Sequence, residues 1–150
     1  MVLEPGEPAP EVSAPNQHGE RVTPDWRGVS VVYFYPKDDT PGCTTEAEQF
    51  QAELESYRDA DVTVYGVSVD GVDSHADFAE EYGIEFDLLA DPDGDLVDAF
   101  DVDRTRGVAS RTTFVVVGGS VQAVYDGVEP DGHARNVLAD LVETGIVTLE

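Results

Sequence analysis

Residues 29–69 read VSVVYFYPKDDTPGCTTEAEQFQAELESYRDADVTVYGVSV, and this stretch decides the fold. Its ends, residues 29–35 and 62–69, are apolar, β-branched and aromatic, which is typical of strands buried on both faces. Between them, residues 44–59 predict an amphipathic helix, because apolar residues recur at three- and four-residue steps. The inward-facing residues of this helix are Ala47, Phe50, Leu54 and Tyr57. A strand, a helix and a strand at this spacing predict a βαβ unit with parallel strands and a right-handed crossover.

The segments on either side complete an α/β pattern. Residues 4–25 are rich in Pro and Gly and predict only a short strand near Val12. The later segments predict, in order, a helix at 74–82 with Ser74 as its N-cap, a strand at 86–90, a turn at 91–94, a short helix at 95–100, a hairpin of strands at 112–117 and 120–125, and a helix at 133–144. We therefore predict one domain over residues 1–150. It has a mixed central sheet with helices on both faces, for which the thioredoxin fold is the obvious candidate.

The charge of the chain restricts its partners and surroundings. There are 32 acidic residues against 8 basic ones, a formal net charge of −24. Such a surface repels nucleic acid and anionic membranes, so we expect neither as a partner. Repulsion among these charges also destabilises the folded state. At about 1 M salt the screening length falls to roughly 3 Å, which removes most of this repulsion. We predict a protein adapted to a salt-rich cytoplasm; an ordinary acidic protein is the alternative.

Cysteine content and apolar runs also bear on location. The start of the chain, MVLEPGEPAPEV, is acidic and Pro-rich, so no signal peptide is expected. No apolar run approaches the roughly 18 residues that a membrane helix needs. A single cysteine excludes an internal disulfide and favours a reducing cytosol. We therefore predict a cytoplasmic protein without a membrane segment.

That single cysteine, Cys43, lies where a helix is expected to begin. Thr40 followed by Pro41 is typical of a helix start, with a capping hydroxyl before a proline in the first helical position. Cys43 then falls in the first turn, where unpaired backbone N–H groups and the helix dipole favour a thiolate. The thiolate is the nucleophilic form of cysteine. Cys43 also lies on the inward stripe of the helix, so an inert core cysteine remains an alternative.

Three other residues favour a reactive thiol. Thr40 stands three residues before Cys43 and is placed to bring its hydroxyl near the sulfur. Pro36 ends the first strand and is placed to shield the sulfur from water. Arg111 precedes the strand at 112–117 and is a cation suited to hold a thiolate together with a polar substrate. Taken one at a time, each has a structural alternative: a helix cap, a strand terminator and a surface ion pair.

Together these residues form P-x-x-x-T-x-x-C, which resembles the active-site signature of peroxiredoxins. The longer stretch YFYPKDDTPGCTTEA is most similar to the bacterioferritin comigratory protein subfamily, also called peroxiredoxin Q. The resemblance extends over nearly the whole chain, through GEPAPEVSAPNQHGERV, VYGVSVD, FDLLADPDG and SRTTFVVV. It implies a thioredoxin-type fold and a thiol-dependent peroxidase that acts on hydrogen peroxide and organic hydroperoxides without a metal or organic cofactor.

The resemblance also implies a role for each site residue. Cys43 would be the peroxidatic cysteine, which attacks the peroxide and becomes a sulfenic acid. Arg111 would stabilise the thiolate and orient the peroxide, Thr40 would donate a hydrogen bond to the peroxide, and Pro36 would cover the sulfur. Glu46 is a weaker candidate for the same network.

One position departs from the subfamily pattern. Many members carry a resolving cysteine five residues after the first, where this chain has Glu48. The resemblance therefore implies a single-cysteine cycle, in which an external thiol reduces the sulfenic acid. That thiol would be a small molecule or a thioredoxin-like protein, and the enzyme would be a monomer, with a dimer as the alternative.

Other functions remain to be weighed against the peroxidase. A non-enzymatic redox sensor or holdase that signals through oxidation of Cys43 is the main alternative, and a domain with an inert thiol is the second. The segment DPDGDLVDAFD lacks the glycine and glutamate positions of a calcium loop and predicts a turn followed by a helix. His18, His75 and His133 lack the spacing of metal ligands, so no metal site is predicted.

Overall fold

A mixed five-stranded sheet forms the centre of the computed structural model, which describes residues 3–105 and 107–148. The strands are β3 (Val29–Phe34), β4 (Val62–Ser68), β5 (Asp87–Ala90), β8 (Thr112–Val117) and β9 (Ser120–Asp126). Their order across the sheet is β5-β4-β3-β8-β9. β3, β4 and β5 run parallel, whereas β8 is antiparallel to both β3 and β9. The predicted parallel βαβ unit, the hairpin and the mixed sheet are confirmed.

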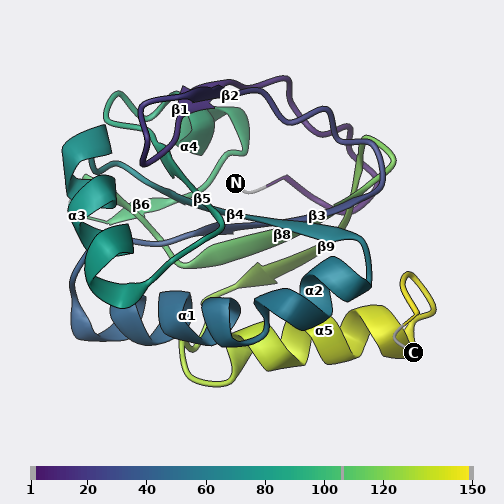
Figure 1. Cartoon of the computed structure of the whole chain (residues 1–150). Helices are drawn as coiled ribbons and strands as arrows, with labels where there is room; N and C mark the ends of the chain where they lie inside the picture. Colours follow the sequence, from purple (N-terminus) through teal and green to yellow (C-terminus); the bar gives the residue numbers. More distant parts are fainter. Residues whose placement is uncertain (1–2, 106, 149–150) are drawn as a thin grey trace.

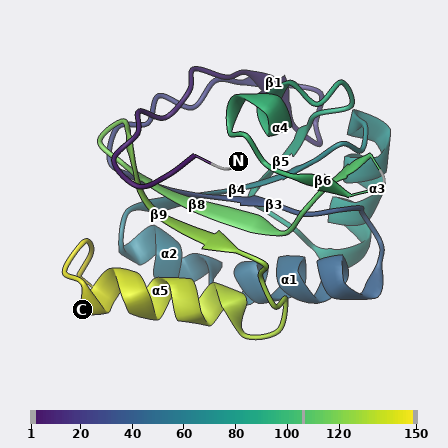
Figure 2. The same cartoon turned by 180° about the vertical axis from the view of Figure 1, so that it is seen from behind.

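Helices cover both faces of this sheet, as predicted (Figures 1 and 2). One face carries α1 (Pro41–Ala52), α2 (Leu54–Asp59) and α5 (His133–Glu143). The other face carries α4 (Asp95–Ala99) and a small hairpin of β1 (Ala14–Pro15) and β2 (Arg21–Val22). α3 (Val72–Tyr82) packs beside β5, and β6 (Arg104–Thr105) pairs with β7 (Val108–Ala109).

The central strand β3 contributes to two hydrophobic cores, which explains its unbroken apolar sequence. Val31 and Tyr33 belong to the core under α1, α3 and α5. Val32 and Phe34 alternate with them and belong to the core on the α4 side. Successive side chains of a strand point to opposite faces, so a strand between two helical layers must be apolar throughout. Cys43 lies in the first of these cores.

The helix after β3 begins as predicted and is interrupted once. Pro41 occupies its first turn, directly after Thr40. Glu53 leaves helical geometry, with φ −94° and ψ 1°, and so divides the predicted helix into α1 and α2. The predicted inward residues Ala47, Phe50, Leu54 and Tyr57 are all buried. The break therefore changes the path of the helix without turning its apolar stripe away from the core.

One local prediction was wrong because a side chain forms a hydrogen bond outside its own helix. α3 begins at Val72 with Gly71 as N-cap, so Ser74 is not the cap; its hydroxyl donates to Asp38 instead. The short strand predicted near Val12 forms two residues later, as β1, and Asn16 closes the β1–β2 turn by accepting two backbone N–H bonds at 2.9 and 3.1 Å. The predicted turn at 91–94 is confirmed, and Asp91 accepts the N–H groups of Leu96 and Val97 at the start of α4.

Candidate active site

Cys43 lies in the first turn of α1, directly beyond the end of β3, and only 1% of it is exposed. Thr40 is the N-cap residue by position, with φ −98° and ψ 153°. Its hydroxyl donates to the carbonyl of Lys37 at 2.9 Å and makes no side-chain capping bond, so the predicted capping hydroxyl was wrong. Thr40 thus fixes the loop before the helix and does not occupy the N–H groups of the first turn.

Arg111 connects the sulfur to a buried carboxylate. Its Nη2 atom lies 3.4 Å from Cys43 Sγ, and its Nη1 atom lies 3.0 Å from Glu46 Oε1. The arginine is held just before β8, the strand beside β3, so residues 68 positions apart meet at one end of the sheet. A guanidinium has a planar array of N–H donors, which allows it to hold two anions at once. The structure therefore joins Cys43, Arg111 and Glu46 in one network.

Glu46 is buried as deeply as the cysteine, with 1% of it exposed. Burial raises the pKa of this carboxyl from 4.5 to about 7, against the opposing effect of Arg111. Within the described residues, Glu46 Oε2 has no hydrogen-bond partner, and neither has the hydroxyl of Tyr33. Burial also raises the pKa of Tyr33, with further contributions from Glu46 and Cys43. The site thus holds two buried acidic groups close to the sulfur, burial favours their neutral forms, and Arg111 is the cation that pairs with Glu46.

Gly42 permits the close approach of the arginine. A Cβ atom at this position would lie 2.6 Å from Arg111 Nη2 and 3.4 Å from Pro130 Cγ. Any larger residue would therefore displace the guanidinium group from the sulfur. The sequence analysis did not identify Gly42, since a glycine after a proline at a helix start carries no signal for contact with a distant strand.

The remaining predicted residues lie around this network. Pro36 is half-buried between β3 and α1, and Thr40 is half-buried at the start of α1. Glu48, where the resemblance led us to look for a resolving cysteine, is exposed on α1. The network that the structure adds to the predicted set consists of Asp38, Asp70 and His75, one ligand-type atom of each lying within 4.8 Å of the others. Sequence spacing missed it because its three residues come from three separate segments.

A sheet with helices on both faces, and a buried, arginine-paired cysteine after its central strand, define a thiol-based redox protein of the thioredoxin-like class. The model of the AhpC/TSA family matches residues 5–124. The chain belongs to this family. It is 38% identical over 152 residues to a protein of Coxiella burnetii described as a putative peroxiredoxin Bcp, covering 94% of this chain and all of that protein. It is 34% identical over 151 residues to peroxiredoxin Bcp of Escherichia coli K12, covering 94% of this chain and 97% of that one.

A solved structure confirms the fold. The bacterioferritin comigratory protein of Xanthomonas campestris, described for its alkyl peroxide reduction activity, aligns with a TM-score of 0.87 at 33% identity. The alignment covers 95% of this chain and 99% of that one. The predicted thioredoxin-like peroxiredoxin fold and the resemblance to the Bcp and peroxiredoxin Q subfamily are both confirmed.

Proposed function

We propose that this protein reduces hydrogen peroxide and organic hydroperoxides through a sulfenic acid at Cys43. Its relatives support the predicted peroxidase activity, since they are described as peroxiredoxins and one of them for alkyl peroxide reduction. The observation that carries the residue assignment is the 3.4 Å contact between Arg111 Nη2 and the buried Cys43 Sγ. A cation at this distance is placed to pair with the thiolate, which is the attacking form of the sulfur, and with a polar peroxide.

The first chemical step follows from this geometry. The Cys43 thiolate attacks the terminal oxygen of the peroxide, so an S–O bond forms as the O–O bond breaks. The sulfur is oxidised to a sulfenic acid, and the departing alkoxide or hydroxide takes a proton from solvent to leave as alcohol or water. Arg111 is placed to stabilise the negative charge that grows on the departing oxygen, because a preorganised donor in a dry site is effective there. Thr40 would donate a hydrogen bond to the peroxide after its hydroxyl turns away from the Lys37 carbonyl, to which it donates in the peroxide-free structure, and Pro36 would exclude water from the sulfur.

Glu46 adjusts the charge that Arg111 presents to the sulfur. The carboxylate and the thiolate share one guanidinium, so an ionised Glu46 competes with Cys43 for the same positive charge. Because the pKa of Glu46 is raised to about 7, the carboxyl holds its proton over part of the neutral range. In that form it leaves more of the positive charge of Arg111 for the thiolate and the peroxide.

Reduction of the sulfenic acid requires a thiol from another molecule. Cys43 is the only cysteine in the sequence, and Glu48 occupies the position of the resolving cysteine. An external thiolate would attack the sulfenic sulfur, so that an S–S bond forms as the S–O bond breaks; the departing hydroxide takes a proton from solvent to become water, and a second thiol would release Cys43 from the mixed disulfide. The reductant we propose is a low-molecular-weight thiol or a thioredoxin-like protein. Until it arrives, further peroxide converts Cys43 to the sulfinic acid.

Peroxide consumption by the wild type and by Cys43→Ser tests this function. With an excess of a dithiol reductant, the wild type is expected to consume many equivalents of hydrogen peroxide, and the variant none above background. The redox-sensor alternative predicts that the wild type consumes one equivalent and then stops, whatever reductant is supplied. An inert thiol predicts no consumption by either protein.

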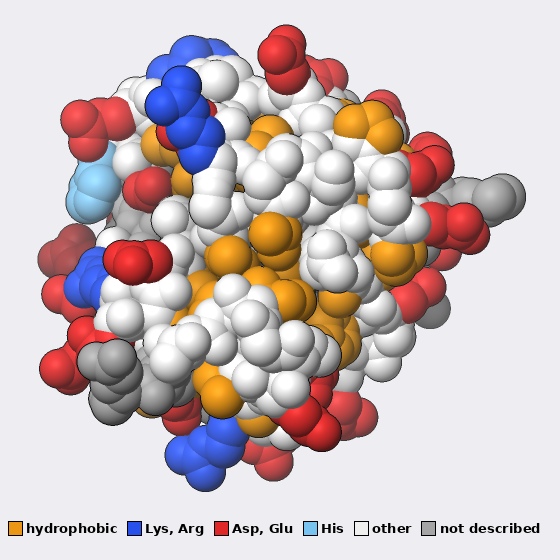
Figure 3. Space-filling model, turned by 90° about the vertical axis from the view of Figure 1, so that its right-hand side faces the viewer, with side chains coloured by type: hydrophobic (Ala, Val, Ile, Leu, Met, Phe, Trp, Pro, Cys, Tyr) orange, Lys and Arg blue, Asp and Glu red, His pale blue; other side chains and the backbone are white. Residues whose placement is uncertain are grey.

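The surface charge supports a proposal about the surroundings of the enzyme. On the face drawn in Figure 3, acidic side chains are scattered around the rim and basic ones are few. A net charge of −24 disfavours contact with nucleic acid and anionic membranes. In the described part of the chain, no helix combines the length and the apolar character needed to cross a membrane. We place the protein in a salt-rich cytoplasm and expect it to be a monomer, which sedimentation velocity in molar KCl tests.

A further inference from the structure

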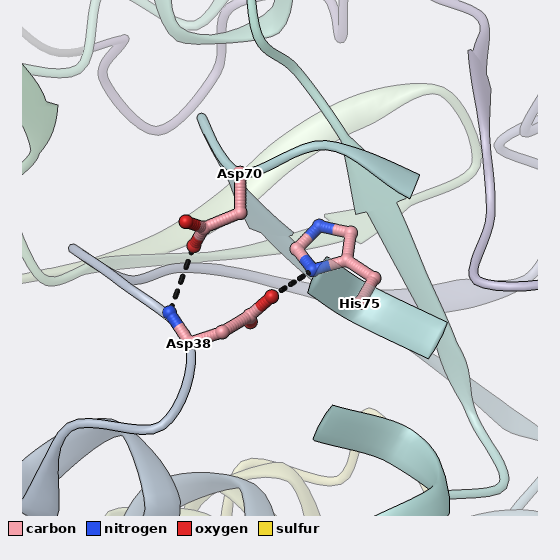
Figure 4. A group of neighbouring side chains, drawn as sticks. All are labelled: Asp38, Asp70 and His75. Atoms are coloured by element: carbon pink, nitrogen blue, oxygen red, sulfur yellow. Dashed lines mark hydrogen bonds and ion pairs between the residues drawn. The ribbon is translucent and has the colours of Figure 1, made fainter. Parts of the chain in front are cut away.

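A buried polar cluster lies beside the loop that leads into the cysteine helix (Figure 4). We call residues 35–40, between β3 and α1, the cysteine loop. Asp38 of this loop lies between Asp70, which follows β4, and His75 of α3. Asp38 Oδ2 lies 2.6 Å from His75 Nδ1, and the backbone N–H of Asp38 donates to Asp70 Oδ2 at 2.8 Å. The side chains of His75 and Asp38 are 0% and 3% exposed, so the pair is shielded from solvent.

Hydrogen-bond partners determine where the protons of this pair lie. His75 Nε2 faces the carbonyl oxygen of Leu89 at 3.0 Å, and a carbonyl only accepts, so Nε2 carries a proton. The 2.6 Å contact between Nδ1 and Asp38 Oδ2 requires one more proton between them. Whether that proton resides on the imidazole or on the carboxyl, the pair has no net charge. It is therefore a closed, neutral unit that is compatible with deep burial.

The carboxyl group of Asp38 also accepts hydrogen bonds from two hydroxyl groups. Tyr35 donates its hydroxyl to Oδ1 at 2.6 Å, and Ser74 donates to Oδ2 at 2.8 Å. Tyr35 in turn stacks on Tyr33 of β3, with ring centroids 5.5 Å apart. Asp38 thus connects the end of the central strand to the first turn of α3 through one carboxyl group.

The segment from β4 to α3 holds the cysteine loop at further points. Asp70, which accepts the N–H of Asp38, is itself held by the Ser68 hydroxyl at 2.7 Å. Asp39 has a left-handed backbone, with φ +59°, and its carboxylate accepts the hydroxyl of Tyr82 at 2.9 Å. A non-glycine residue in this conformation is costly and needs support from its surroundings. α3 and the residues before it supply that support.

The position of the Cys43 sulfur depends on two sets of contacts, which lie on opposite sides of β3. Arg111 reaches Cys43 from the β8 side, whereas the Asp38–His75 pair holds the cysteine loop from the β4 side. Thr40 ends the loop, and Cys43 follows three residues later. A displacement of the loop by about 1 Å would break the 3.4 Å contact between sulfur and guanidinium, and misplacements of that size cost about 100-fold in rate.

We propose that Asp38 and His75 are positioning residues, which hold the cysteine loop in the conformation that keeps Cys43 covered and in contact with Arg111. This inference rests on the peroxidase function proposed above. A cation bound by Asp38, Asp70 and His75 is the competing explanation of the cluster. The hydrogen bonds favour the positioning role, because each carboxylate oxygen facing the cluster and both ring nitrogens of His75 already have a partner.

Two substitutions of His75 separate the bond to Asp38 from the bond to Leu89. Asn places an amide near the position of Nδ1 and keeps a donor for Asp38, whereas Gln places its amide near Nε2 and keeps a donor for Leu89 only. We expect His75→Gln to lower the second-order rate constant for peroxide oxidation of Cys43 at least tenfold, and His75→Asn to recover most of that loss. Quenched-flow mass spectrometry of Cys43 measures this rate without a reductant.

A second measurement distinguishes positioning from general damage to the fold. Cys43 is 1% exposed, so a released loop is expected to raise the rate of its alkylation by iodoacetamide in His75→Gln while the peroxide rate falls. Tyr57→Phe is the control: it removes a buried hydrogen bond of 2.6 Å to the Ala134 carbonyl, in the same core and at the far end of α2. We expect this control to lose stability but to keep both rates within twofold of the wild type.

The outcomes are decisive in either direction. The positioning role is wrong if His75→Gln keeps the wild-type peroxide rate. It is also wrong if the alkylation rate falls together with the peroxide rate, because both reactions need the thiolate and both would slow if the thiolate were lost. It is also wrong if dialysis of the wild type against EDTA lowers the peroxide rate and Zn²⁺ restores it, since the cluster would then hold a cation. If the wild type itself fails to react with peroxide, the proposed function fails instead.

Discussion

Replacing Glu46 by Gln tests the electrostatics of the site most fully, because the buried carboxyl is predicted to make stability depend on pH. Its pKa is about 7 in the folded protein and 4.5 in the unfolded chain. The folded state therefore binds the proton more tightly, and this contribution to stability is complete below pH 4.5 and lost as the pH rises through about 7. The difference corresponds to about 3 kcal/mol, at 1.36 kcal/mol for each tenfold change in proton affinity. Glu46 is 1% exposed, so solvent screening does not reduce this figure much.

Glutamine has nearly the same shape and does not ionise. The unfolding free energy of the wild type, minus that of Glu46→Gln, is expected to fall by about 2 to 3 kcal/mol between pH 5 and pH 8. Urea unfolding in molar KCl, followed by the fluorescence of the buried Trp26, measures both proteins. Glu48→Gln is the matched control, because Glu48 is exposed on the same helix and its difference from wild type is expected to be flat.

A pH-independent difference between the wild type and Glu46→Gln would refute the reasoning. It would mean that Arg111 compensates the buried carboxylate fully, so that Glu46 stays ionised throughout the range. The proposed competition between Glu46 and Cys43 for one guanidinium would then operate at every pH.

Three further predictions concern Arg111, Gly42 and the net charge of the protein. Arg111→Lys is expected to lower the peroxide rate constant about 100-fold, because a lysine carries all its N–H donors on one nitrogen and lacks the planar pair of nitrogens that contacts Glu46 and the sulfur separately; an unchanged rate in a stopped-flow assay would contradict this. Gly42→Ala, whose Cβ would lie 2.6 Å from Arg111 Nη2, is expected to reduce the same rate at least tenfold while circular dichroism shows a folded protein; wild-type kinetics would show that the guanidinium has room to move. Raising KCl from 0.1 M to about 1 M is expected to raise the urea midpoint, because the screening length falls from about 10 to about 3 Å around a net charge of −24; equal midpoints would contradict adaptation to salt.

The main elements of the fold were predictable because their patterns are strong. β3 and β4 read as unbroken apolar runs, and the structure places each between two cores. The Gly118–Gly119 pair predicts the tight turn between β8 and β9, and both glycines have positive φ, at 56° and 88°. Shorter features depended on side-chain bonds that no periodicity reveals. The N-cap of α3 is one example, since Ser74 serves Asp38 rather than its own helix.

The candidate site was predictable in part for a related reason. Cys43 belongs to a recognisable motif, and Arg111 is one of few positive charges in the chain. The structure places Arg111 Nη2 3.4 Å from Cys43 Sγ. Gly42 and His75 have no comparable signal, because their importance comes from neighbours that are distant in sequence. Gly42 meets Arg111, 69 positions later, and His75 meets Asp38 at a separation of 37 residues. Such pairings follow from the topology of the sheet, which places the ends of β3, β4 and β8 together.

Mass spectrometry of the folded protein after brief exposure to one equivalent of hydrogen peroxide tests the central claim most directly. With dimedone present to trap sulfenic acid, the account predicts one adduct per chain, located at Cys43, and strong loss of that adduct in the Arg111→Lys variant. If Cys43 stays unmodified in the wild type while the denatured chain reacts at the same rate as free cysteine, the sulfur is an inert part of the core and the account is contradicted.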